Sequence, residues 1–127
     1  MTALFETGLS GWLRATPTGQ DAVYKTTFAE HHLGNTWIRS LHGGVTGSMI
    51  ELSAEAETRN ATSQDADLMI VSSSIDYLRI TKDADLFARA TIRRLSRRLS
   101  VVDVTCWQDS EDIPIARGVV TIKIEPS

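Results

Sequence analysis

The chain is organised around one stretch, LHGGVTGSMIE at residues 41–51. Two adjacent glycines stand near its start, and from Gly43 to about Glu57 apolar residues return every three or four positions. This spacing predicts a helix of about four turns, with one narrow apolar stripe that faces the core. The stripe consists of Val45, Met49, Leu52 and Ala56.

Small and acidic side chains share another face of the predicted helix. At about 100° per residue, Gly44, Ser48, Glu51 and Glu55 project together, away from the apolar stripe. A glycine costs roughly 1 kcal/mol of helix propensity relative to alanine, so the pair at 43–44 requires a reason. One reason is close approach of a ligand to the unpaired N–H groups of the first turn, which suit a developing oxyanion. Tight packing of the helix on a sheet is the alternative.

Glu51 is the candidate acid on this face. Glu55, one turn later, would repel it, and the repulsion would raise the pKa of one of the two carboxyl groups if the face is dry. A carboxylate poised in this way can act as a base or a nucleophile. In the alternative, the face is wet, Glu55 pairs with Arg59, and Glu51 is simply solvated.

The rest of the chain predicts a sheet around this helix. A short irregular helix over 2–14 and a strand over 23–33 come before it. Alternating apolar and polar residues predict strands after it at 68–80, 86–93, 99–107 and 116–124. Short connections between these strands imply a mostly antiparallel sheet that covers a single helix, an α+β fold in one domain over residues 1–127.

Composition limits the class of protein. A chain of 127 residues with 42% apolar and 23% charged side chains is ordinary for one globular domain. The net charge of -3 argues against nucleic acid as the main partner. No segment is long enough to span a membrane, and the first fifteen residues do not resemble a secretory signal. The single cysteine, Cys106, favours a reducing compartment and a cytoplasmic protein, and no cysteine cluster suggests zinc.

The stretch at 41–51 resembles the signature of the hotdog-fold acyl-CoA thioesterases of the phenylacetate-pathway and 4-hydroxybenzoyl-CoA type. In that family His-Gly-Gly opens the central helix and an acidic residue follows nine positions after the His, as Glu51 follows His42 here. The resemblance extends from about Asn35 to Ile124. It implies a hotdog fold, in which an antiparallel sheet wraps around one long central helix. The other similar segments are IDYLR at 75–79, RRLSRR at 93–98 and IARG at 115–118.

The same resemblance implies a site. Gly43 would donate its backbone N–H to the thioester carbonyl oxygen beside Gly44, and Glu51 would attack the carbonyl carbon or activate a water. His42 would support the helix start by hydrogen bonding rather than act as the base. The carboxylate and the bound carbonyl would belong to different subunits of a homodimer or of a tetramer built as a dimer of dimers. Acyl-CoA would be the substrate, and no metal or cofactor is expected beyond its own coenzyme A.

One position departs from the family pattern. Many relatives carry Asn or Gln six residues before the His, where this chain has Thr36, and Asn35 lies one residue earlier. A one-residue shift could let Asn35 orient the carbonyl or the water, the Thr36 hydroxyl could do so, or the role could be lost. The alternative function is therefore a non-catalytic acyl-CoA binding module on the same fold, and a hydratase or dehydratase ranks last.

Four arginines within residues 93–98 suit the phosphates of coenzyme A. A solvated strand end is an equal alternative, and alternation sends Arg93 and Arg94 to opposite faces. Arg97 and Arg98, expected in a turn, are the better candidates. Tyr77 is a candidate for lining an acyl pocket, as is Trp37, although large aromatic residues are more often core or interface residues.

Overall fold

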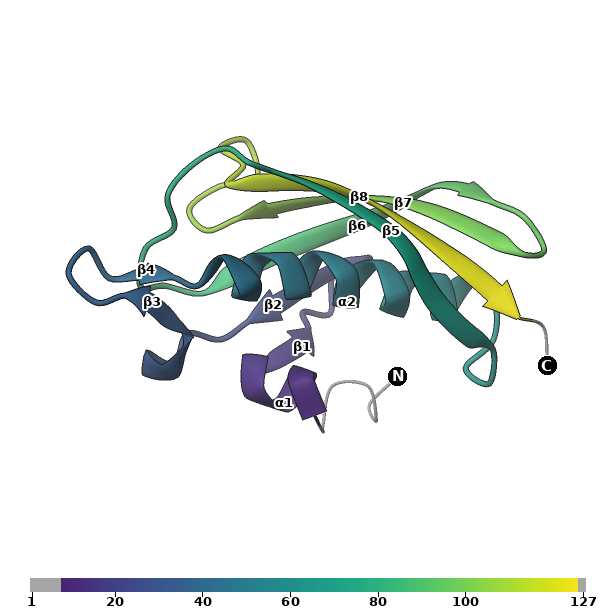
Figure 1. Cartoon of the computed structure of the whole chain (residues 1–127), viewed down its shortest axis with the longest axis horizontal. Coiled ribbons are helices and arrows are strands. Elements are labelled where there is room, and N and C mark those ends of the chain that lie inside the picture. The colour runs from purple at the N-terminus through teal and green to yellow at the C-terminus, as the bar shows by residue number, and fades with distance from the viewer. Residues whose placement is uncertain (1–7, 126–127) are drawn as a thin grey trace.

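The structure is a computed structural model that describes residues 8–125 (Figure 1). Its helices are α1 (Gly8–Leu13), a short 3-10 helix η2 (Glu30–His32) and the long α2 (Gly43–Ala61). Its strands are β1 (Ala15–Pro17), β2 (Val23–Thr26), β3 (Leu33–Asn35), β4 (Ser40–Leu41), β5 (Asp67–Tyr77), β6 (Leu86–Leu95), β7 (Leu99–Trp107) and β8 (Ala116–Glu125).

Six strands form one sheet in the order β1-β2-β6-β7-β8-β5, and every neighbouring pair is antiparallel. The β3–β4 hairpin stands apart from it. Figure 1 shows α2 lying against one face of the curved sheet, with α1 and β1 on the far side of the helix from β5 and β8. The predicted α+β architecture, with an antiparallel sheet around a single long helix, is confirmed.

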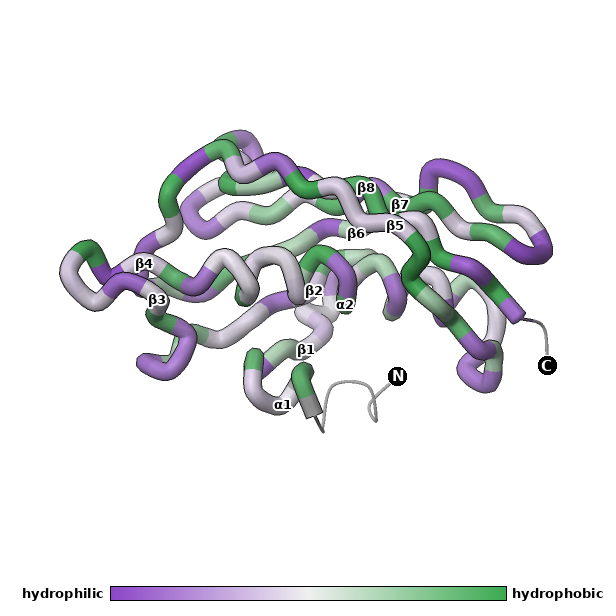
Figure 2. Tube along the Cα trace, in the orientation of Figure 1, coloured by the Kyte–Doolittle hydropathy of each residue, from purple (hydrophilic) through white to green (hydrophobic). Residues whose placement is uncertain are grey.

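The core forms where the apolar stripe of α2 meets the inward face of the sheet. All four predicted stripe residues are buried, and β7 and β8 bury every second side chain as their sequences predict. Figure 2 shows the resulting alternation of hydrophobic and hydrophilic residues along these strands. The helix lies very close to β8, because a Cβ atom at Gly118 would stand 2.7 Å from the Cγ2 atom of Ile50.

Several boundaries differ from the sequence predictions. The strand predicted over 23–33 ends at Thr26, because side chains then replace the ladder as hydrogen-bond acceptors: Phe28 N–H donates to Asp85 at 2.7 Å, and Ala29 N–H donates to His32 Nδ1 at 3.2 Å. The helix predicted to end near residue 57 runs one turn further. The N-terminal helix is shorter than predicted, and residues 2–7 of that prediction lie outside the described residues.

Strand β5 is the outer strand of the sheet on the side away from β1. It ends at Tyr77 instead of residue 80, since the N–H groups of Leu78 and Arg79 turn to the carbonyl of Ile115. Within the described chain, β5 pairs only with β8, and its other edge is open. Met69 and Val71 on this strand are exposed. No helix of residues 8–125 is both long enough and apolar enough to cross a membrane.

Candidate active site

The start of α2 is fixed by backbone contacts of His42. This residue is the N-cap; its N–H donates to His32 O at 2.8 Å, and its carbonyl accepts from Val45 N–H at 2.9 Å. The ring makes no capping hydrogen bond. It lies against Gly34 instead, where an added Cβ would stand 2.8 Å from the ring Nδ1. The hydrogen bonding expected of His42 is therefore supplied by its main chain.

The first turn of α2 has backbone N–H groups without hydrogen-bond partners among residues 8–125. The N–H groups of Gly43 and Gly44 have no hydrogen-bond partner in the described structure, as expected for the first residues of a helix. Outside α2 itself, a Cβ atom on Gly44 would meet no described residue within 4 Å, and one on Gly43 would meet the Tyr77 hydroxyl at 3.9 Å. Tight packing therefore does not explain these two glycines. Their exposed N–H groups lie at the positive end of the helix dipole, which favours a negatively charged oxygen.

Tyr77 reaches this turn from the end of β5. Its hydroxyl donates to the carbonyl oxygen of Gly43 at 3.1 Å. The glycine that admits it is Gly47, where an added Cβ would stand 3.3 Å from the Tyr77 oxygen. A shallow groove of about 210 Å³ lies on this side of the turn, lined partly by Ile38, Leu41 and Tyr77. The structure thus brings Tyr77 to the predicted site.

Glu51 lies two turns further along α2. It is half-buried, and its side chain makes no hydrogen bond or ion pair with another residue of the described chain. Glu55, in contrast, pairs with Arg59 at 3.3 Å, as in the wet-face alternative. That pair neutralises the charge expected to repel Glu51. The carboxylate of Glu51 is therefore free to meet a reactant.

The two predicted catalytic groups do not meet within one chain. Glu51 follows Gly43 by eight residues in a continuous helix, which separates them by about 12 Å along the helix axis. A carbonyl oxygen bound to the Gly43 N–H would lie about 3 Å from that nitrogen, and a base or nucleophile must also come within about 3 Å of the carbonyl group or its attacking water. Glu51 is therefore too far along the helix to reach a carbonyl that is bound by Gly43 of the same chain.

Asn35 and Thr36 lie in the β3–β4 hairpin that leads to α2. The Asn35 side-chain oxygen accepts from Trp37 N–H at 3.0 Å and from Ile38 N–H at 3.4 Å, so it is used in the turn itself. Thr36 is exposed and forms no hydrogen bond with the described residues. Trp37, at the tip, is 94% exposed. Arg39 ties the hairpin down through ion pairs at 2.6 Å with Glu30 and Asp83.

Arg97 and Arg98 belong to the turn between β6 and β7, which lies at the opposite end of α2 from Gly43 (Figure 1). Arg97 borders an open groove of about 520 Å³ beside Thr62 and Ser63, just past the helix C-terminus. Because a helix of 19 residues is about 28 Å long, the turn that carries Arg97 and Arg98 does not reach the first turn of α2 in the same chain.

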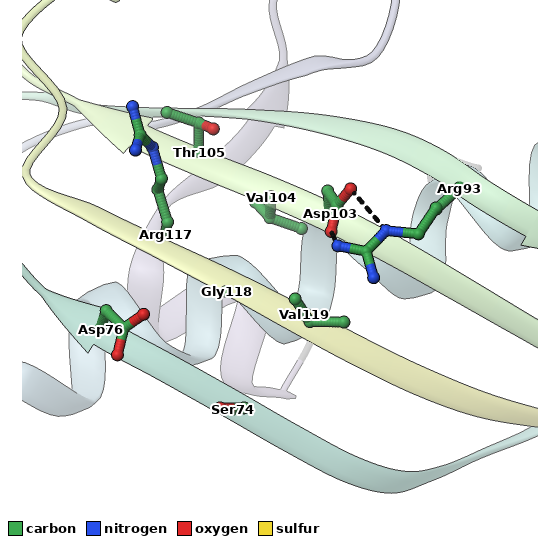
Figure 3. A pocket seen from close by; sticks show the side chains of 9 residues that line it. All are labelled: Ser74, Asp76, Arg93, Asp103, Val104, Thr105, Arg117, Gly118 and Val119. Atoms are coloured by element: carbon green, nitrogen blue, oxygen red, sulfur yellow. Dashed lines mark hydrogen bonds and ion pairs between the residues drawn. The ribbon is translucent and has the colours of Figure 1, made fainter.

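Two hollows were not predicted from the sequence. One, of about 400 Å³, lies on the outer face of the sheet, where Arg93 holds Asp103 through two hydrogen bonds of 3.0 and 2.5 Å (Figure 3). Strand alternation could have placed Arg117 and Thr105 on that face. The other, of about 370 Å³, lies between α1 and the first turns of α2. The sequence holds no local signal for it, because its two walls are far apart in the chain. No group of His, Cys, Asp and Glu suited to a metal ion occurs within residues 8–125.

Comparison with known proteins gives the family. The profile of the acyl-CoA thioesterase N-terminal domain matches residues 33–123. A comparison with curated proteins found no match. Among solved structures, a Staphylococcus aureus thioesterase is similar with a TM-score of 0.83 and 18% identity, covering 94% of this chain and 100% of that chain.

Two further structures are similar at low identity. A Bacillus halodurans protein solved with CoA has a TM-score of 0.81 and 16% identity over 94% of this chain and 76% of that chain. A phenylacetic acid degradation-related protein from Ralstonia eutropha has a TM-score of 0.78 and 18% identity over 91% of this chain and 88% of that chain. These likenesses show the predicted hotdog fold. The profile match runs from β3 almost to the end of β8, so the chain belongs to the acyl-CoA thioesterase family.

Proposed function

We propose that this protein hydrolyses acyl-CoA thioesters, with the Gly43 N–H as oxyanion donor and Glu51 as nucleophile or general base. One observation carries the proposal: the first turn of α2 presents unpaired N–H groups at Gly43 and Gly44, and no described side chain packs over Gly44. Donors fixed in this way stabilise the negative charge that develops on a carbonyl oxygen under attack. Family membership supplies the thioester as the group that would be attacked.

The chemistry then follows one of two routes. As a general base, Glu51 takes a proton from water while the water oxygen bonds to the carbonyl carbon; the tetrahedral intermediate expels the CoA thiolate and leaves the free acid. As a nucleophile, the carboxylate bonds to that carbon and expels the thiolate, and water then hydrolyses the mixed anhydride. In both routes the Gly43 N–H holds the same oxygen.

The active form is proposed to be a homodimer, or a tetramer of two such dimers. The separation of about 12 Å between Gly43 and Glu51 along one helix supports a site that draws each group from a different subunit. The long open edge of β5, with its exposed apolar residues, suits pairing with a second copy. A two-fold axis would reverse α2 between subunits, so that the first turn of one helix lies beside a later turn of the other.

Thr36 is proposed to stand where relatives have an amide. The Staphylococcus aureus protein was solved with alanine replacing a glutamine and, separately, a glutamate fifteen residues later. The same interval separates Thr36 from Glu51. The Asn35 oxygen is already used within the hairpin turn, whereas the Thr36 hydroxyl is free to orient a water or the carbonyl.

Coenzyme A is proposed to bind across the subunits as part of the substrate, with no other cofactor. Arg97 and Arg98 lie at the far end of α2 from Gly43 in their own subunit. Because the partner's α2 would run in the opposite direction, the β6–β7 turn of the partner would lie nearer to Gly43. We therefore propose that the arginines of that turn bind the coenzyme A phosphates. The similarity to a Bacillus halodurans protein solved with CoA is consistent with that ligand. A cytoplasmic location stays a prediction from the single cysteine.

The test is a thiol-release screen over short, long, branched and aromatic acyl-CoAs with the parent and Glu51→Ala. Loss of the carboxylate should lower the rate by about 100-fold or more. Glu55→Gln is the matched control, because Glu55 is on the same face but pairs with Arg59. If folded Glu51→Ala cleaved the whole panel as fast as the parent, the assignment would be wrong. Saturable acyl-CoA binding without thiol release from the parent would favour a binding module instead.

A further inference from the structure

The groove between α1 and α2 opens directly beside the bare helix start. Leu9 and Trp12 form its wall on α1, while Gly44, Val45 and Ser48 line it from α2, with His42 at the end. Its volume of about 370 Å³ is within the range of small-molecule sites. Gly44 lines the groove and also exposes an unpaired N–H, so the groove borders the first turn of α2, where Gly43 is the proposed oxyanion donor.

Trp12 is held in place although its side chain is 44% exposed. Its carbonyl oxygen accepts hydrogen bonds from Nε2 of His31 at 2.6 Å and from Nε2 of His32 at 3.0 Å. Its ring centre also lies 4.8 Å from the ring centre of His31 and 5.2 Å from that of His32. His32 Nδ1 accepts from Ala29 N–H, which assigns the His32 proton to Nε2. A large apolar side chain that is anchored yet exposed is suited to contact a ligand.

The lining decides which part of an acyl-CoA fits. The side walls of Leu9, Trp12 and Val45 are apolar, and no Lys or Arg among residues 8–125 lines the groove. Such a surface suits a hydrocarbon group and offers no lysine or arginine side chain to a phosphate. We propose that this groove takes the acyl group of the thioester, and that Trp12 and Leu9 select aromatic and medium-length alkyl groups over acetyl. The inference rests on the proposed thioester hydrolysis and adds the class of acyl group.

The test compares octanoyl-, benzoyl- and acetyl-CoA in the parent, Trp12→Ala and Leu9→Ala. Removing the indole should lower kcat/KM about 10- to 200-fold for octanoyl- and benzoyl-CoA, the range for pocket contacts of this kind, and leave acetyl-CoA within about two-fold. Ile113→Ala is the matched control, since this side chain is 49% exposed and lies in the β7–β8 loop outside the groove. Trp12→Phe should restore part of the preference.

Three other outcomes have distinct meanings. An equal loss for all three acyl groups, or a change of oligomeric state without a change of preference, would overturn the inference and make Trp12 a structural or subunit contact. A selectivity change in Trp12→Ala with no effect of Glu51→Ala would sink the proposed mechanism and leave the groove assignment standing. If the parent releases no thiol, calorimetry can measure the affinities of the parent for octanoyl-CoA and for free CoA. An acyl group that binds in the groove should make octanoyl-CoA bind more tightly, so equal affinities would contradict the inference.

Discussion

The backbone N–H of Gly43 can be removed while the helix keeps its course. Gly43 is the first residue of α2, where proline is favoured, and His42 before it already has φ -54 and ψ 138, a conformation that proline accepts. Gly43→Pro should therefore fold and lose its oxyanion donor. We expect kcat to fall by about 100- to 1000-fold, measured as thiol release from the best acyl-CoA of the panel.

Gly43→Ala supplies the control for this change. It keeps the N–H and adds a methyl group that, among the described residues outside α2, comes within 4 Å of the Tyr77 hydroxyl alone, at 3.9 Å. Its activity should stay far above that of Gly43→Pro. Equal and near-parental rates in the two variants would remove Gly43 from the oxyanion site.

At the residue scale, the sequence was most informative where spacing within one helix decides the geometry. Gly44 and Glu51 could be placed on one face of α2 because every residue of a helix has a fixed angular position. The residues of the β3–β4 hairpin could not be placed in this way. Whether Asn35 or Thr36 is free depends on which of them closes the turn, and the hydrogen bonds to Trp37 and Ile38 decide that.

Helix α1 is attached through a histidine whose charge state matters. Burial lowers the pKa of His32 below its usual 6.5, with the hydrogen bond to the Trp12 carbonyl acting in the opposite direction. The unfolded chain therefore takes up this proton more readily than the folded chain. The contribution of His32 to stability is complete above about pH 6.5 and is lost as pH falls from there towards the lowered pKa.

We expect the free energy of unfolding to fall below pH 6.5, measured by urea denaturation at a series of pH values. His32→Gln can still donate to the Trp12 carbonyl without titrating, so its slope in this window should be smaller than that of the parent. His31→Gln is the comparison, because His31 is exposed while His32 is buried. If the free energy of unfolding of His32→Gln fell with pH as steeply as that of the parent, the pH dependence would come from other groups.

At the element scale, period-two alternation was enough for the strands that bury one face. Strands β7 and β8 alternate as predicted because one face of the sheet packs against α2 and the other faces outward. The strand predicted over 23–33 failed beyond Thr26, since its ladder is replaced by an acceptor, Asp85, that comes almost sixty residues later. A hydrogen-bond acceptor so distant in the sequence cannot be predicted from the local pattern of apolar and polar residues.

The dimer can be tested through the two halves of its proposed site. A purified heterodimer of one Glu51→Ala subunit and one Gly43→Pro subunit has one site with both groups intact and one with neither, if the groups come from different subunits. It should recover about half of the parent rate, although each homodimer is nearly inactive. With both groups from one subunit, neither site would be intact and the rate would stay at the variant level.

At the scale of the whole molecule, the sequence predicted the architecture better than the site. The order of elements and their short connections were sufficient for the sheet and its helix. The location of Arg97 and Arg98 relative to Gly43 was not predictable, because it depends on the length of α2 and on which way the β6–β7 turn faces. The separation of Gly43 and Glu51 along this helix is what makes a partner subunit necessary in the proposed site.

The burial of Cys106 affects how these experiments can be done. It is the only cysteine of the chain, it lies fully buried on the inner side of β7, and burial raises its pKa to about 12. A disulfide reagent reacts with thiolates, so folded protein should consume almost none at neutral pH. The colour that develops in a thiol-release assay then measures the coenzyme A that is liberated. Reagent consumed before acyl-CoA is added measures the unfolded fraction of each variant in the same cuvette.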